Sequence, residues 1–327
     1  MTSGRKRLVT AITGLALAAT LGLVPSSPAG AEPDINDVQA RVDRLYREAE
    51  QASERYNGTK VQLDRLKQDL GSLQFDEEKQ DKALNVMRGE VRESVLRQFT
   101  GNSAGAIGQV ISSGDPSTLL QQMSTMSSYQ RIQQGMFDDY TTGLKALNIR
   151  RKATRARLDL VSNAEAQLAA DKATIDEKLA DAKSLLSDLE AKEREAVLSR
   201  GSFRTPSDVP ASGRAAAAIG YAMAQVGDSY VYGAVGPSAW DCSGLTMAAW
   251  AQAGVALPHS SAAQYGSGMH VSASALQPGD LVFYYSPISH VGMYIGNGLI
   301  VHAANPGAGV RVSELYSMPY VGAVRPG

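Results

Sequence analysis

Apolar side chains follow two different periods along this chain, and the change of period divides the chain into two parts. From residue 35 to about residue 196 they recur at alternating steps of three and four, the heptad spacing of helices that pack side by side. After residue 213 a helical stretch is followed by runs in which every second residue is apolar, as in a half-buried strand. The pattern predicts a long all-helical part followed by a mixed domain of helix and sheet.

The helical part contains two heptad seams with an interruption between them. The first seam comprises twelve positions in one register: Ile35, Val38, Val42, Leu45, Ala49, Ala52, Tyr56, Thr59, Leu63, Leu66, Leu70 and Leu73. The second continues in one register from Leu119 to Ala196 and includes Met123, Met126, Phe137, Leu147, Leu158, Ala182 and Leu186. Glycine, serine and proline interrupt the helix between the seams, at 101–105 and 112–116. We expect an antiparallel coiled-coil hairpin over residues 32–200, with a small lobe at about 100–116.

A basic start and an apolar run precede the helical part. Arg5, Lys6 and Arg7 come before the apolar residues 8–24, and Ala29-Gly30-Ala31 has the small-x-small pattern of a cleavage site. We therefore expect residues 1–31 to be an export signal that is removed, and the protein to be secreted. No later segment is apolar enough to span a membrane.

Composition separates the second part from the first. Residues 201–213 (GSFRTPSDVPASG) are typical of a linker, and residues 214–327 contain all four histidines, both tryptophans and the single cysteine. The 32 basic and 33 acidic residues leave a net charge of −1, so nothing favours nucleic-acid binding. In an exported chain, Cys242 is then a buried apolar residue, an intermolecular link or a reactive thiol.

The residues around Cys242 favour a reactive thiol. Asp241 is a suitable N-cap, the apolar spacing that follows is helical, and Gly254 is a suitable helix end. Cys242 would lie on the first turn of this helix, where unpaired backbone N–H groups and the helix dipole favour a thiolate.

Two histidines lie on a predicted hairpin further along the chain. Residues 289–304 alternate around Gly296-Asn297-Gly298, and a three-residue loop places Gly292 opposite His302. His290 and His302 then share one face, whereas a two-residue loop would separate them. Cys242, His290 and His302 would supply a nucleophile, a general base and a group that orients the base.

Five motifs in this part resemble the NlpC/p60 family of cysteine peptidases, which cut bacterial cell-wall peptides. They are 227–233 (GDSYVYG), 241–245 (DCSGL), 257–264 (LPHSSAAQ), 278–283 (PGDLVF) and the 289–304 hairpin. The resemblance covers residues 213 to 325 and implies a papain-like α+β fold, with the cysteine helix packed on an antiparallel sheet that carries both histidines.

The resemblance also implies roles for individual residues. Cys242 matches the family's nucleophile, His290 its base and His302 its third polar residue. Tyr230 is expected to face the oxyanion beside the backbone N–H of Cys242. Asp241, Ser243 and Ser261 match positions that line the substrate cleft. Two segments depart from the family's pattern: His259-Ser260 stands where the family often has Arg-Thr, and Tyr232-Gly233-Ala234 where it often has Trp-Gly-Gly. These departures leave the substrate preference open. We expect no catalytic role for His259 and a surface position for His270.

By this resemblance we expect a secreted, wall-associated peptidoglycan endopeptidase that cleaves stem-peptide amides. The bond that the resemblance favours is the one between D-glutamate and diaminopimelate. The helical part is similar to those of actinobacterial wall hydrolases involved in cell separation. This similarity implies that the hairpin either holds the catalytic domain inactive or docks it to a membrane complex of the division machinery. We expect no metal and no cofactor, because zinc-binding His-Glu-x-x-His, Cys-x-x-Cys and phosphate-binding glycine motifs are missing from the sequence.

Two other functions remain open from the sequence. One is an adaptor whose hairpin activates another wall enzyme. The other is a thiol amidase or acyltransferase that acts on a substrate outside the wall.

Overall fold

The computed structural model describes residues 35–100, 116–189 and 213–327, with the single residues 191, 194 and 211. The expected export signal at 1–31, most of the lobe at 100–116 and most of the linker at 201–213 lie outside the described residues.

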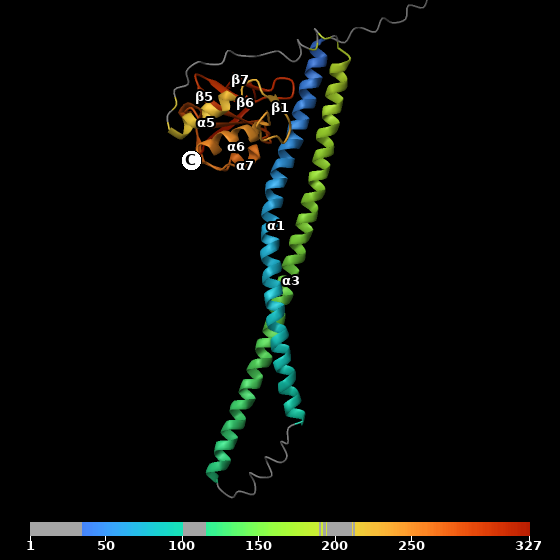
Figure 1. Ribbon diagram of the computed structural model, residues 1–327, viewed down its shortest axis with the longest axis vertical. Coiled ribbons are helices and arrows are strands. Elements are labelled where there is room, and N and C mark those ends of the chain that lie inside the picture. The colour runs from blue at the N-terminus through green and yellow to red at the C-terminus, as the bar shows by residue number, and fades with distance from the viewer. Residues whose placement is uncertain (1–34, 101–115, 190, 192–193, 195–210, 212) are drawn as a thin grey trace, which may run out of the picture.

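Two long helices form the first part. Helix α1 (Ile35–Thr100) has 66 residues and helix α3 (Pro116–Ser187) has 72. They run antiparallel, since Val38 and Val42 near the start of α1 pack with Ala182 and Leu186 near the end of α3. Figure 1 shows the two helices side by side over much of their length and diverging toward the residues that join them. The helical hairpin predicted from the sequence is confirmed.

Burial follows the predicted seam on α1 but only half of it on α3. On α1 the seam positions that are described as buried are Val38, Val42, Ala49, Ala52, Leu63 and Leu66. On α3 Leu147 and Ala182 are buried, whereas Leu158 is 44% exposed. The predicted register is wrong at Leu158, where the neighbouring Arg157 pairs with Asp69 of α1. Further along α3, the buried Asp171 pairs with Arg55 of α1.

The second part is a mixed domain around one antiparallel sheet. Its elements are α5 (Gly213–Ala224), β1 (Ser229–Tyr230), β2 (Ala239–Trp240), α6 (Cys242–Gln252), α7 (Ser261–Gln264), β3 (Met269–Val271), η1 (Ala273–Ala275), β4 (Leu281–Tyr284), β5 (His290–Gly296), β6 (Leu299–Ala303), β7 (Val310–Glu314) and β8 (Tyr320–Arg325). The six-stranded sheet has the order β3-β8-β4-β5-β6-β7, and every neighbouring pair is antiparallel.

The main core of this domain lies between the helices and one face of the sheet. Val291, Met293 and Ile295 of β5 pack with Leu245 and Ala249 of α6, all at most 2% exposed. Their alternate spacing on β5 is the period-two pattern of the sequence. A smaller cluster covers the other face, so the central strands β4, β5 and β6 are buried on both sides. The α+β fold with a cysteine-bearing helix on the sheet is therefore confirmed.

The mixed domain lies against the N-terminal part of α1. Helix α1 runs between this domain and α3 (Figure 1). The hydroxyl of Tyr232 donates to the carbonyl of Tyr46 at 2.8 Å, which links the two parts.

Of the helices that the structure describes, each is too short or too polar to cross a membrane.

We expect Arg55→Met to lower the free energy of unfolding of the hairpin by about 1–3 kcal/mol. Asp171 is only 2% exposed, and Arg55 Nε donates to its carboxylate at 3.0 Å. Without Arg55, this buried carboxylate keeps the hydrogen bond from Gln167 Nε2. Urea denaturation followed by far-ultraviolet circular dichroism measures the change.

The matched control for this prediction is Arg157→Met. Arg157 also pairs with an α1 carboxylate, Asp69, but both side chains are substantially exposed, so its loss should cost well under 1 kcal/mol. Equal effects of the two substitutions would contradict the role assigned to the buried Asp171.

Candidate active site

Cys242 is the first residue of α6, as the sequence predicts. The carboxylate of Asp241 caps the helix and accepts from the backbone N–H of Gly244 at 2.6 Å. The same carboxylate accepts from the N–H of Gly233 at 3.0 Å, which ties the preceding loop to the helix start. The Cys242 side chain is 1% exposed and lies at the edge of the main core.

The two predicted histidines lie on one face of the β5–β6 hairpin. Met293 pairs with Val301, which places Gly292 opposite His302 as expected. A side chain at Gly292 would place its Cβ 3.3 Å from the Cβ of His302, so glycine leaves room for the ring. His290 Nε2 and His302 Nδ1 are 2.7 Å apart, within one hydrogen bond.

The turn of this hairpin differs from the predicted three-residue loop. Gly296 pairs with Leu299, and only Asn297 and Gly298 lie between them, with φ values of 53° and 71°. A bulge between Tyr294 and Gly296 adds the residue that the shorter loop omits. The two histidines therefore share a face despite the two-residue turn.

Ser313 extends this pair of imidazoles and was missed by the sequence reasoning. Its Oγ lies 2.9 Å from His302 Nε2 on the neighbouring strand β7. Ser313 can be identified only from the pairing of β6 with β7, which no local sequence pattern indicates. Burial lowers the pKa of His302 well below its ordinary value, and the charges of His290 and Arg311 lower it further. His302 is thus a neutral ring that can orient His290.

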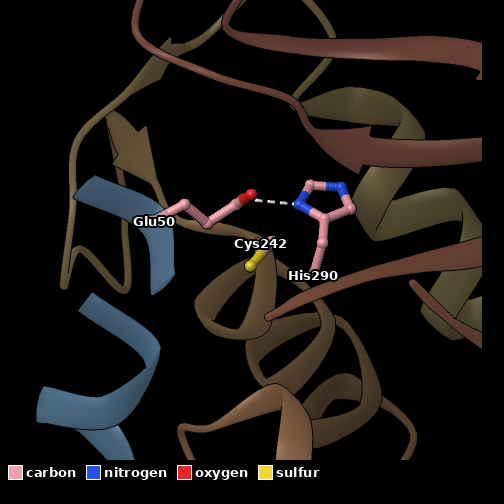
Figure 2. A group of neighbouring side chains, drawn as sticks. All are labelled: Glu50, Cys242 and His290. Atoms are coloured by element: carbon pink, nitrogen blue, oxygen red, sulfur yellow. Dashed lines mark hydrogen bonds and ion pairs between the residues drawn. The ribbon is translucent and has the colours of Figure 1, made fainter. Parts of the chain in front are cut away.

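The structure brings Cys242 and His290 together with a third residue that was not predicted, Glu50 of α1. One donor atom from each of the three lies within 4.8 Å of the other two. Figure 2 shows the Glu50 side chain reaching from α1 to the His290 ring, with the sulfur of Cys242 beside them. Glu50 Oε1 lies 2.6 Å from His290 Nδ1, the ring nitrogen that a cysteine base would use.

A second α1 carboxylate, Glu54, covers the start of α6. Its Oε1 accepts from Ser243 Oγ at 2.6 Å and from Cys242 Sγ at 3.5 Å. Its Oε2 accepts from the N–H and the hydroxyl of Ser261, at 2.6 and 2.8 Å. The side chains of Glu50 and Glu54 are one helical turn apart and nearly buried, each residue being 6% exposed. Their i, i+4 spacing was the only signal in the sequence, and such spacing is common on exposed helices.

The thiol of Cys242 is protonated in this arrangement, contrary to the expectation of a thiolate. Burial raises the pKa of Cys242 well above its ordinary value, and the nearby carboxylates, led by Glu54, raise it further. These effects exceed the help that a helix start gives to a thiolate. Burial likewise raises the pKa of Glu54, and the charge of Asp241 adds to the shift.

The four residues expected to bind substrate all lie around the place that α1 occupies. Ser243 and Ser261 hold Glu54, and Asp241 accepts from Asn57 of α1 at 3.0 Å. Tyr230 is 5% exposed and lies edge-on to Tyr232, with ring centroids 4.9 Å apart.

The remaining two histidines lie outside the Cys242–His290–His302 group. His259 Nε2 contacts the Asp241 carboxylate at 2.8 Å, and His270 is exposed beside Tyr265. Burial alone would lower the pKa of His259, but the hydrogen bond and the charge of Asp241 outweigh it, so the pKa is raised.

We expect His259→Gln to remove a pH-dependent part of the stability. Because the pKa of His259 is higher in the folded protein, the protonated ring stabilises the fold fully below about pH 6.5, its ordinary pKa. That contribution disappears as the pH rises through the higher folded pKa. Urea denaturation from about pH 5 to about pH 9 should show this fall in the wild type and a smaller one in the variant. His270→Gln is the control, and parallel curves for wild type and His259→Gln would contradict the assignment.

The C-terminal domain matches a family of known proteins. The model of the NlpC/P60 family matches residues 227–324. Probable endopeptidase Rv2190c of Mycobacterium tuberculosis is 49% identical over 107 residues, which are 33% of this chain and 28% of that protein. Probable endopeptidase Cgl2188 of Corynebacterium glutamicum is 42% identical over 116 residues, 36% of this chain and 56% of that protein.

A solved structure also covers this domain. The crystal structure of the NlpC/p60 domain of peptidoglycan hydrolase SagA is 34% identical, with a TM-score of 0.32, and the match covers 34% of this chain and 97% of that one. This chain matches only 28% to 56% of the length of the two curated relatives above.

Proposed function

We propose that the chain is a peptidoglycan endopeptidase with Cys242 as nucleophile, because its C-terminal domain matches the NlpC/P60 family over residues 227–324. The single observation that carries the proposal is the hydrogen-bonded row His290–His302–Ser313 beside a cysteine at a helix start. A row of this kind fixes which nitrogen of His290 faces the thiol.

The proposed reaction begins when α1 is away from the cleft. His290 Nδ1 takes the proton of Cys242 as the sulfur bonds to the amide carbonyl carbon, while His290 Nε2–H donates to His302. The oxyanion is held by the backbone N–H of Cys242 and the hydroxyl of Tyr230. The imidazolium then protonates the leaving nitrogen, which leaves a thioester. Water, deprotonated by His290, hydrolyses the thioester and releases a carboxylic acid.

The contacts of Glu54 support an acidic stem peptide as substrate. Ser243 and Ser261 already hold one carboxylate in this structure. D-glutamate in a stem peptide carries a carboxylate of the same kind beside the amide that joins it to diaminopimelate. We infer that this D-glutamyl–diaminopimelate bond is the one cleaved.

The position of α1 supports a gating role for the hairpin. Glu50 occupies the basic nitrogen of His290, and the thiol beneath Glu54 is out of reach of a peptide. The arrangement is therefore a closed form, and we infer that hydrolysis needs α1 to leave the cleft.

The far part of the hairpin supports docking to a partner. Several large apolar side chains are 42–67% exposed near its tip: Leu96, Leu120, Met123, Met126, Ile132 and Phe137. Such a patch is typical of an interaction surface. We infer that a membrane complex of the division machinery binds there after the chain is secreted to the wall.

We expect Cys242→Ala to abolish release of peptides from purified peptidoglycan fragments, because the attacking sulfur is gone. Mass spectrometry of the products identifies the bond that the wild type cleaves. His270→Gln, outside the site, should retain the wild-type rate. Wild-type protein that leaves stem peptides intact but hydrolyses another amide would favour the amidase alternative.

We expect Glu50→Ala with Glu54→Ala to raise the rate on the same fragments at least about tenfold. Hydrogen bonds to a charged group contribute about 1.5–3 kcal/mol each, so losing several favours the open form. The matched control is Glu78→Ala with Glu93→Ala, which removes two exposed α1 carboxylates paired within their own helix. An unchanged rate in the first variant would overturn the gating role without affecting the assignment of Cys242.

A further inference from the structure

The closed cleft gathers three different metal-binding side chains at one point. Glu50 offers a carboxylate oxygen, Cys242 a sulfur and His290 an imidazole nitrogen, all buried and all within 4.8 Å of one another (Figure 2). This is the donor set that zinc prefers among biological cations. We propose that the closed form binds one Zn²⁺ through Glu50, Cys242 and His290, and that the ion fastens α1 to the catalytic domain.

The donor positions suit a small tetrahedral ion. With bonds of about 2.0–2.3 Å, tetrahedral zinc places its ligand atoms about 3.3–3.7 Å apart. Glu50 Oε1 and His290 Nδ1 are 2.6 Å apart, a hydrogen-bond distance, and they must separate by about 1 Å when an ion takes the place of the hydrogen. Rotation of the Glu50 side chain supplies that movement, since its carboxylate is at the end of a flexible chain.

The neighbours of His290 already fix the ring as a ligand requires. Its Nε2 is engaged by His302, which in turn contacts Ser313, so Nδ1 is the nitrogen directed at Cys242 and Glu50. Metal-bound histidines almost always have their second nitrogen held in this manner. The row that orients the base in the proposed reaction thus also orients a metal ligand.

The charge of the closed cleft favours a cation. Glu50, Glu54 and Asp241 are all buried there, and the basic groups hydrogen-bonded to them are the imidazoles of His290 and His259. When Zn²⁺ binds, the Cys242 S–H bond breaks, a Zn–S bond forms, and the proton leaves to water. The proton shared by Glu50 and His290 leaves in the same way, so the ion meets a thiolate, a carboxylate and a neutral imidazole.

Space for an ion and a water lies next to Glu50. A cavity of about 360 Å³ between α1 and the sheet is lined by both Glu50 and His302. Water from this cavity would fill the fourth position, as it does in zinc sites with three protein ligands.

Zinc binding would be coupled to closure because Glu50 belongs to α1. With α1 away, only Cys242 and His290 remain as donors. The ion therefore binds the closed form more tightly and shifts the population toward it. The site rests on the closed geometry alone and does not depend on which amide the domain cleaves.

The test uses the full chain, first freed of metal with a chelator and then titrated with Zn²⁺ and with Co²⁺. Equimolar Zn²⁺ is expected to raise the thermal midpoint of unfolding. Co²⁺ is expected to give a thiolate-to-metal charge-transfer band, which reports on Cys242 because the chain has no other cysteine. Glu50→Ala should weaken binding of both ions at least about tenfold.

Glu54→Ala separates ligation from closure. It also loosens α1 but removes none of the three donors, so it should keep the charge-transfer band and bind more tightly than Glu50→Ala. The proposal is overturned if the wild type shows neither the band nor the thermal shift, or if the two variants bind equally. Neither readout needs turnover, so the two proposals fail separately: if the metal-free Glu50→Ala, Glu54→Ala variant cleaved no wall fragment while the wild type showed the band, the peptidase function would be refuted and the metal site would stand.

Discussion

The contact between Glu50 and His290 is the interaction on which this structure depends. It joins residues 240 positions apart, is nearly excluded from water, and is 2.6 Å long. A buried carboxylate and a buried imidazole each need the other, since either alone would remain desolvated without a partner. Formation of this contact places Glu54 against Ser243 and Ser261 and removes the thiol from solvent. This one contact thereby contributes both to the docking of α1 and to the burial that keeps Cys242 protonated.

Helix α1 contacts the cleft only when the face that carries Glu50, Glu54 and Asn57 is turned toward it. Glu50, Glu54 and Asn57 form one stripe at helical spacing, whereas seam residues such as Ala49 and Ala52 are buried elsewhere on the helix. The ion pair between Arg55 and the buried Asp171 fixes the rotation of α1 relative to α3. A movement of α3 would therefore be transmitted to the cleft, because the two helices are packed through apolar residues such as Val42 and Ala182 and joined by the buried carboxylate of Asp171.

The sequence predicts those features that depend on local periods. Helical spacing after Asp241 places Cys242 on a first turn, and strand parity brings His290 and His302 to one face, although a bulge and not a longer loop preserves that parity. Features that depend on contacts between distant segments were not predictable. The role of Ser313 can be predicted only if β6 and β7 are known to be neighbours. The roles of Glu50 and Glu54 can be predicted only if α1 is known to dock on the cleft. The protonated thiol follows from that docking. The second heptad seam holds at Leu147, Ala182 and Leu186 but not at Leu158, beside which Arg157 pairs with α1.

The polar groups that hold α1 are those that would bind a substrate, so opening exchanges one set of partners for another. If the α1 carboxylates together contribute about 3–6 kcal/mol, the closed form exceeds the open form about 10²- to 10⁴-fold. A tethered helix also competes at an effective concentration in the millimolar range, which a dilute wall peptide does not match. Substrate alone would then open the cleft poorly. In the gating that we propose, release comes from work applied to the hairpin at a distance from the cleft, and the exposed apolar side chains near its tip are where the proposed partner would apply it.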